Sequence, residues 1–147
     1  MRNEAFAVRS SLAVLLVMQL TACSTAYQER GGMFGHLTGG YQEEKAAGGL
    51  IKVTYRGNES ILMHQVQDYA LYRCAEIARR EGSPYFALYQ TLPDALRDRR
   101  SVMVRPTTLL GVPHAEVYIR LRSSAEPGLL SASEVQARLL PSIASVK

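Results

Sequence analysis

Thiols and paired carboxylates are the side chains of this 147-residue chain that could do chemistry. The two cysteines, Cys23 and Cys74, are too few for a disulfide-rich scaffold or a four-cysteine zinc site. Asp68 and Glu76 lie eight positions apart in a stretch with helical periodicity, where two carboxylates could flank a substrate. We expect instead that both are solvated or ion-paired helix charges, with Glu76 pairing with Arg80 four residues on.

The three histidines, His36, His64 and His114, raise the hypothesis of a copper site, because imidazole and the thioethers of nearby methionines suit copper. No two histidines have the close spacing of metal ligands, and Met63 and His64 are neighbours that point apart on a helix. We therefore expect no metal. Cys74 falls on the apolar face of the same helix and is interpreted as a buried hydrophobic residue, not a reactive thiol.

Motifs of the common enzyme classes are missing from the sequence. It contains no Gly-x-Ser-x-Gly, no phosphate-binding glycine loop and no His-Glu-x-x-His. The apolar share of 47% and the charged share of 20% fit one ordinary globular domain, and a net charge of +4 is too small to indicate nucleic acid. The basic stretch at residues 97–105 is interpreted as a solvated loop, with anionic lipid headgroups as the alternative partner. We expect a protein without catalysis or cofactor.

The N-terminus carries the most specific pattern. An apolar run at residues 12–20 follows a positively charged start and is shorter than the roughly 20 residues that a membrane span needs. It leads into Leu20-Thr21-Ala22-Cys23, which resembles the lipobox of bacterial lipoproteins. The resemblance implies that a signal peptidase recognises Leu20, Thr21 and Ala22, and that the Cys23 thiol carries a diacylglycerol.

This pattern predicts three parts. Residues 1–22 form a signal peptide, residues 23–38 form a lipidated, glycine-rich flexible tether, and residues 39–147 form a single domain. One acyl chain gives only marginal anchoring, whereas two or three hold a protein firmly on a membrane. Ser24 in place of Asp after the lipidated cysteine favours the outer membrane, facing the periplasm.

Alternation of apolar residues predicts strands at 50–56 and 114–122, and a run that is apolar on both faces predicts a central strand at 85–89. Short strands are expected at 101–105 and at 39–44, which would pair with 50–56 in a hairpin across the turn at Gly48 and Gly49. Helical periodicity predicts a long helix at about 64–81 and a short C-terminal helix that starts near Ser131 and stops at Pro141. One long helix can cover only one face of a sheet. The predicted fold is therefore α+β, a two-layer sandwich of a small, mostly antiparallel sheet with the long helix packed on it.

Short motifs between residues 39 and 86 carry a wider resemblance. Gly39-Gly40-Tyr41, the strand end Val-Thr-Tyr-Arg-Gly-Asn at 53–58, and the helical segment 68–76 are similar to motifs of a group of uncharacterised bacterial envelope lipoproteins. Their Tyr-Phe strand corresponds to residues 85–86 here. The resemblance covers roughly residues 20–90 and implies location and fold only, since the group has no established enzymatic activity. Cys74 replaces an alanine that is usual in that group.

Tyrosines are the last clue to function, because the chain has eight and no tryptophan. Tyr41, Tyr55, Tyr69 and Tyr72 are predicted to gather around the sheet and long helix, where they could form an amphipathic binding surface or half-buried packing. We expect a membrane-anchored, non-catalytic module that docks an envelope protein. The alternative is a periplasmic ligand-binding lipoprotein for a lipid, glycan or peptidoglycan fragment, with a concave pocket lined by tyrosines.

Overall fold

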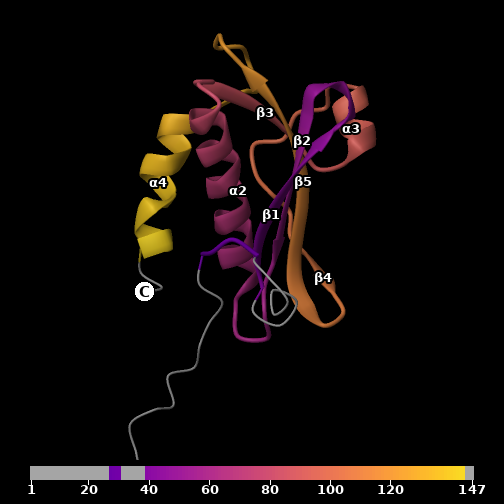
Figure 1. Ribbon diagram of the computed structural model, residues 1–147, viewed down its shortest axis with the longest axis vertical. Helices are drawn as coiled ribbons and strands as arrows, with labels where there is room; N and C mark the ends of the chain where they lie inside the picture. Colours follow the sequence, from indigo (N-terminus) through magenta and orange to yellow (C-terminus); the bar gives the residue numbers. More distant parts are fainter. Residues whose placement is uncertain (1–26, 31–38, 145–147) are drawn as a thin grey trace, which may run out of the picture.

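The computed structural model describes residues 27–30 and 39–144 (Figure 1). In these residues the chain forms one sheet of six strands, with the order β1-β2-β5-β3-β6, and all neighbouring strands pair antiparallel. The central strand β5 pairs with β2 on one side and with both β3 and the short β4 on the other. The predicted α+β class is confirmed.

The strands are β1 (Gly40–Ala46), β2 (Leu50–Arg56), β3 (Tyr85–Tyr89), β4 (Thr107–Leu109), β5 (Val112–Arg122) and β6 (Leu130–Ser131). Strands β1, β2, β3 and β5 have bounds close to the predicted ones, whereas β4 and β6 were not predicted. A single 3-10 turn, η1 (Ala47–Gly49), joins β1 to β2, and Gly48 and Gly49 both have a positive φ there, which glycine adopts without strain. The predicted hairpin across this turn is confirmed.

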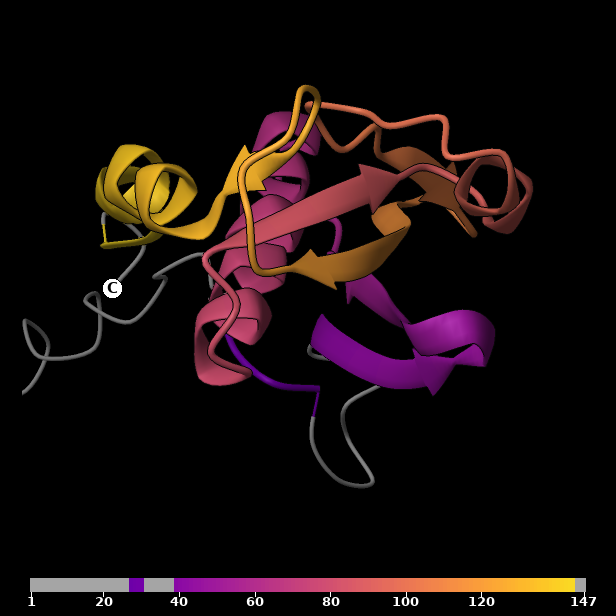
Figure 2. The same ribbon diagram turned by 90° about the horizontal axis from the view of Figure 1, so that it is seen from above.

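The long helix α2 (Met63–Arg80) and the C-terminal helix α4 (Ala132–Ala144) lie on the same face of the sheet (Figures 1 and 2). The short helix α3 (Leu92–Leu96) lies at the opposite face, which the sequence left uncovered. Its Ala95 packs on Leu50, Ala87 and Tyr89 in a second small core. Thr91 caps α3 by accepting a hydrogen bond from the Asp94 amide at 3.2 Å.

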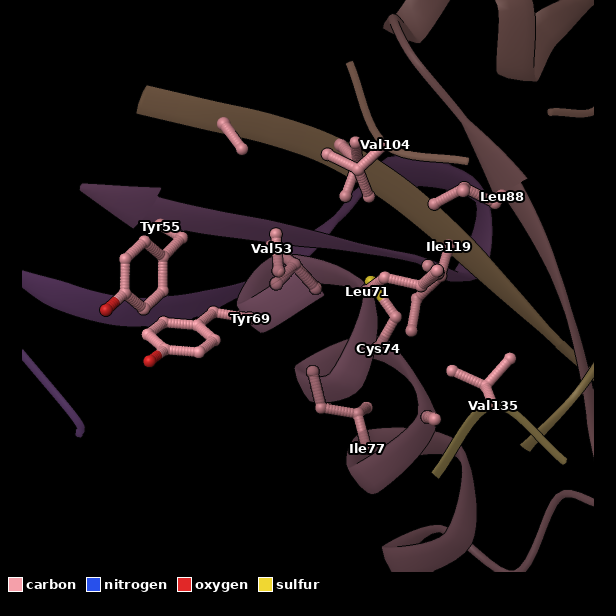
Figure 3. Close-up of a cluster of buried hydrophobic side chains, with 14 of the residues drawn as sticks. Val53, Tyr55, Tyr69, Leu71, Cys74, Ile77, Leu88, Val104, Ile119 and Val135 are labelled. Carbon is pink, nitrogen blue, oxygen red and sulfur yellow. The ribbon is translucent and has the colours of Figure 1, made fainter. Parts of the chain in front are cut away.

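The main core lies between α2 and the sheet (Figure 3). The helix contributes Val66, Ala70, Cys74 and Ile77, the residues that its periodicity placed on one face, and none of these side chains is exposed. The inward residues of β5 alternate with partly exposed ones, as predicted. The core side chains that Figure 3 labels are Val53, Tyr55, Tyr69, Leu71, Cys74, Ile77, Leu88, Val104, Ile119 and Val135.

Two predicted boundaries are wrong. Residues 101–105 form no strand, and only Ser101 makes a bridge, to Leu88. The side chain of Gln90 donates to the Met103 carbonyl at 2.5 Å and accepts from the Arg105 amide at 3.1 Å, so a side chain satisfies backbone groups that a ladder would have paired. Buried Val104 explains the strand-like pattern.

The predicted stop of the C-terminal helix at Pro141 is also wrong, because α4 continues through this proline to Ala144. A proline removes one helical hydrogen bond, here the bond to the carbonyl of Ala137. Both Ala137 and Pro141 are exposed, so water can reach that carbonyl. Ser131 opens the helix as predicted, since its hydroxyl accepts from the Glu134 amide at 3.4 Å.

Candidate functional site

Residues 27–30 are fixed to the domain. Glu29 bridges Tyr41 of β1 in parallel, with the Arg30 amide donating to the Tyr41 carbonyl at 2.8 Å and the Tyr41 amide donating to the Gln28 carbonyl at 2.9 Å. The prediction of a flexible tether over 23–38 is therefore wrong for this part. The parallel bridge satisfies backbone groups at the edge of β1. The glycine content of the 23–38 segment gives no sign of this pairing.

Tyr27 places its ring among three other tyrosines. Its ring centroid lies 5.2 Å from that of Tyr41, 5.7 Å from that of Tyr69 and 5.3 Å from that of Tyr72. Tyr69 in turn packs edge-on against Tyr55 at 5.3 Å. Each such aromatic pair adds ~0.5–1.5 kcal/mol beyond its buried area, so this tyrosine cluster holds the 27–30 segment on α2 and β1.

A chain of charges borders the tyrosine cluster. The Tyr27 hydroxyl donates to Glu76 Oε2, which also accepts from Arg73 at 2.9 Å. Arg73 reaches Glu43 of β1 at 3.3 Å, and Glu43 pairs with Arg80 at 2.8 Å. Glu76 therefore pairs with Arg73, and the expected Glu76–Arg80 pair is replaced by one between Arg80 and Glu43. The Arg73 guanidinium also lies 4.0 Å above the Tyr41 ring, a cation–π geometry.

The electrostatics of this cluster favour a protonated phenol. Burial raises the pKa of Tyr27, and the hydrogen bond to the Glu76 carboxylate raises this pKa further. Burial likewise raises the pKa of Tyr55 and of Tyr69. Tyr27 is therefore a hydrogen-bond donor at neutral pH, and its partner Glu76 is engaged by both a phenol and a guanidinium. This arrangement suits attachment of a segment better than proton transfer to a substrate.

The predicted tyrosine surface needs correction. The side chains of Tyr55 and Tyr69 are fully buried, because β2 and the inner face of α2 turn both rings into the core. Tyr41 and Tyr72 are half-buried and covered in part by Tyr27. The four tyrosines are thus brought together as predicted, but they serve the core and the docked segment and do not form an open surface.

Other predicted site residues have varied outcomes. Cys23, Leu20, Thr21 and Ala22 lie outside the described residues. Cys74 is fully buried, and burial raises the pKa of its thiol, which confirms its interpretation as packing. Within the described ranges, no three histidine, cysteine, aspartate or glutamate side chains gather in a way that could hold a metal ion.

A polar pocket of about 460 Å³ opens on the face of the sheet that α2 does not cover. Burial lowers the pKa of His114 in its wall, and the nearby Arg56 lowers this pKa further against the opposing effect of Glu116. The buried Nδ1 of His114 has no hydrogen-bond partner among the residues that the structure describes. The lining residues are Gln90, Thr91, Asp94, Arg105, Thr107, His114 and Glu116. The ligand-binding alternative predicted a pocket lined by tyrosines, but no tyrosine lines this pocket.

Sequence reasoning missed Tyr27, Glu43 and Arg73. Two of the three could have been found from the sequence. The strand alternation that places Tyr41 toward the helix also places Glu43 there, and Arg73 lies one helical turn before Glu76. Tyr27 had no such signal, because it contacts Glu76 across 49 positions of sequence.

The part of the chain that the structure describes contains no helix long and apolar enough to cross a membrane. Comparison with models of protein families, with curated proteins and with solved structures finds no match to this chain.

Proposed function

We propose that the protein is a lipid-anchored, non-catalytic binding or structural module of the bacterial cell envelope. The observation that carries this proposal is the lipobox-like sequence Leu20-Thr21-Ala22-Cys23 just four residues before Tyr27, which is fixed to the domain. Four residues span at most ~14 Å, so a lipid on Cys23 would hold the domain close against the bilayer. The short connection between the proposed lipid and the fixed segment at Tyr27 supports a role in which the domain is held at the membrane and docks a partner there.

Replacement of Cys23 tests the anchor. In a bacterium that processes lipoproteins, the chain is expected to incorporate radiolabelled palmitate and to lose residues 1–22, because the Cys23 thiol would carry a diacylglycerol whose fatty acids take up the label. Cys23→Ser is expected to abolish both the label and the cleavage. Cys74→Ala is the matched control, since it removes the only other cysteine and leaves labelling unchanged. Labelled or cleaved Cys23→Ser protein would contradict the proposal.

Crosslinking in intact cells tests the docking role. A binding module is expected to yield a defined envelope protein whose crosslinks fall on one face of the domain when read by mass spectrometry. Outer-membrane fractions are expected to contain the protein, as Ser24 implies. Crosslinks scattered evenly over the surface, to abundant proteins only, would contradict a docking role.

The polar pocket favours the second candidate, a ligand-binding lipoprotein. Its volume lies within the ~300–1,000 Å³ of small-molecule sites. Its lining offers an amide, hydroxyls, carboxylates, a guanidinium and an imidazole with an unpaired nitrogen, which suit a glycan or peptidoglycan fragment better than an acyl chain. Such a ligand would bind in the periplasm, where the anchor would place the domain.

A disaccharide-peptide fragment of peptidoglycan is the probe for this pocket. If the second candidate is right, titration is expected to shift the backbone amide resonances of Thr107 and Glu116, and Arg105→Ala is expected to weaken binding about tenfold, or ~1.4 kcal/mol. Arg97→Ala is the control, because Arg97 is exposed and outside the lining. Unchanged spectra at saturating probe would rule this candidate out for that fragment.

A further inference from the structure

Four of the exposed large apolar side chains lie at one end of the molecule, while others lie elsewhere, among them Leu92 and Leu96 of α3. Leu62 and Met63 precede and begin α2, with 58% and 40% of their surface exposed, and Leu109 and Leu110 form the tip of the β4–β5 hairpin, with 45% and 84% exposed. Figure 1 shows the β2–α2 loop and this hairpin at the same lower end. A hydrogen bond of 2.8 Å from the Gly57 amide to the Pro113 carbonyl ties the two together.

The hairpin tip is unusual in its sequence. Leu110 has φ 52° and Gly111 has φ 83°, a turn with two left-handed residues in which Asn-Gly or Gly-Gly is the favoured pair. A leucine there is both strained and exposed, so neither backbone preference nor core packing accounts for it. A contact between this leucine and a partner outside the domain would account for it.

The docked N-terminal segment can reach this end. Tyr27 contacts Tyr69 of α2, six residues after Met63, and six helical residues rise ~9 Å. The four residues from Cys23 to Tyr27 span up to ~14 Å, which is enough to bring a lipid on Cys23 level with the start of α2.

Cationic side chains accompany the apolar ones. Gly40, Arg56 and His114 face one another across β1, β2 and β5 at the ends of these strands nearest the β2–α2 loop. Arg56 is the strand partner of His114, and the Arg30 amide donates to the carbonyl of Tyr41, the residue after Gly40, so these two cations lie at the same end of the sheet. Apolar tips flanked by cations suit a lipid surface that carries anionic headgroups.

From these observations we propose that the end formed by Leu62, Met63, Leu109 and Leu110 faces the membrane and inserts its side chains among the lipid headgroups. The proposal rests on the proposed lipid anchor at Cys23, which brings the surface within reach. It fixes an orientation: α3, at the other end of the sheet in Figure 1, points away from the bilayer.

Fluorescence quenching in vesicles tests this orientation with the full lipidated chain. A thiol-reactive fluorophore is placed at Leu110→Cys in one variant and at Leu96→Cys of α3 in the other, since both leucines are highly exposed, at 84% and 77%. Acylated Cys23 and buried Cys74 do not compete for the label. The vesicles contain phosphatidylethanolamine, phosphatidylglycerol and a nitroxide-labelled lipid.

Stronger quenching at Leu110→Cys than at Leu96→Cys, by about twofold or more, is expected for a site ~5–10 Å deep in the interface. Equal quenching, or stronger quenching at Leu96→Cys, would overturn the orientation while leaving the anchor intact. The mass of the N-terminal peptide is measured in the same samples. A peptide without lipid would overturn the proposed anchor and, with it, the orientation that depends on it.

Discussion

Replacing Tyr69 with alanine is expected to lower the free energy of unfolding by ~3–5 kcal/mol, the usual loss for a large buried aromatic side chain. The Tyr69 ring is fully buried and contacts both Tyr27 and Tyr55 at ring-centroid distances of 5.7 and 5.3 Å. Its removal leaves a cavity between α2 and β2 and also weakens the seat of the 27–30 segment. Urea unfolding followed by circular dichroism measures the change.

Phenylalanine at the same position is expected to have the opposite effect. The Tyr69 hydroxyl is buried and has no hydrogen-bond partner in the described part of the chain, so its removal should raise the free energy of unfolding by ~1 kcal/mol. Tyr27→Phe is the matched control: it loses a hydrogen bond to a carboxylate and is expected to lower that free energy by ~1.5 kcal/mol. Equal losses in both phenylalanine variants would show that the Tyr69 hydroxyl is paired after all.

The main features of the fold follow from local patterns in the sequence. The alternation at Ile51, Val53 and Tyr55 and the helical spacing of Val66 and Cys74 report burial on one face directly, and both elements have nearly the predicted bounds. These patterns are reliable because an amphipathic element must bury its apolar face wherever it packs.

The errors arise where a distant group decides local structure. Residues 101–105 have the composition of a strand, yet the side chain of Gln90 takes the backbone groups that a ladder would need. The helix α4 passes Pro141 because the carbonyl that loses its partner is at the surface. Neither the hydrogen bonds of Gln90 nor the exposure of this part of α4 can be predicted from local residue propensities.

The candidate site divides in the same way. The prediction that Tyr41, Tyr55, Tyr69 and Tyr72 lie close together is correct, since strand alternation and helical spacing place them near one another. It could not show that Tyr27 would fill the space between them, because four residues with no periodicity carry no signal of a contact made across 49 positions. A patch that composition suggested was free is therefore occupied by the chain itself.

Raising the pH above 10 is expected to unfold the protein cooperatively. Burial raises the pKa of Tyr27, Tyr55 and Tyr69 above the ordinary value of about 10, so the folded state retains phenolic protons that the unfolded state loses. Groups with a raised pKa contribute stability that is fully present below pH 10 and is lost as the pH rises. Each proton that the folded state fully retains costs about 1.4 kcal/mol per pH unit, so Tyr27 and Tyr55, whose pKa values are raised most, together cost about 3 kcal/mol per unit.

A domain at the lower end of ordinary stability, ~5 kcal/mol, would therefore unfold about two pH units above 10. Absorbance of tyrosinate and far-ultraviolet circular dichroism should change together in that range, because the buried phenols ionise only when the chain opens. Tyr69→Phe removes one of the three titrating groups and an unpaired hydroxyl, so it should move the midpoint to higher pH. If the three tyrosines instead ionised gradually around pH 10 with the circular dichroism unchanged, they would be open to water, and the 27–30 segment would not be held on α2 as these contacts require.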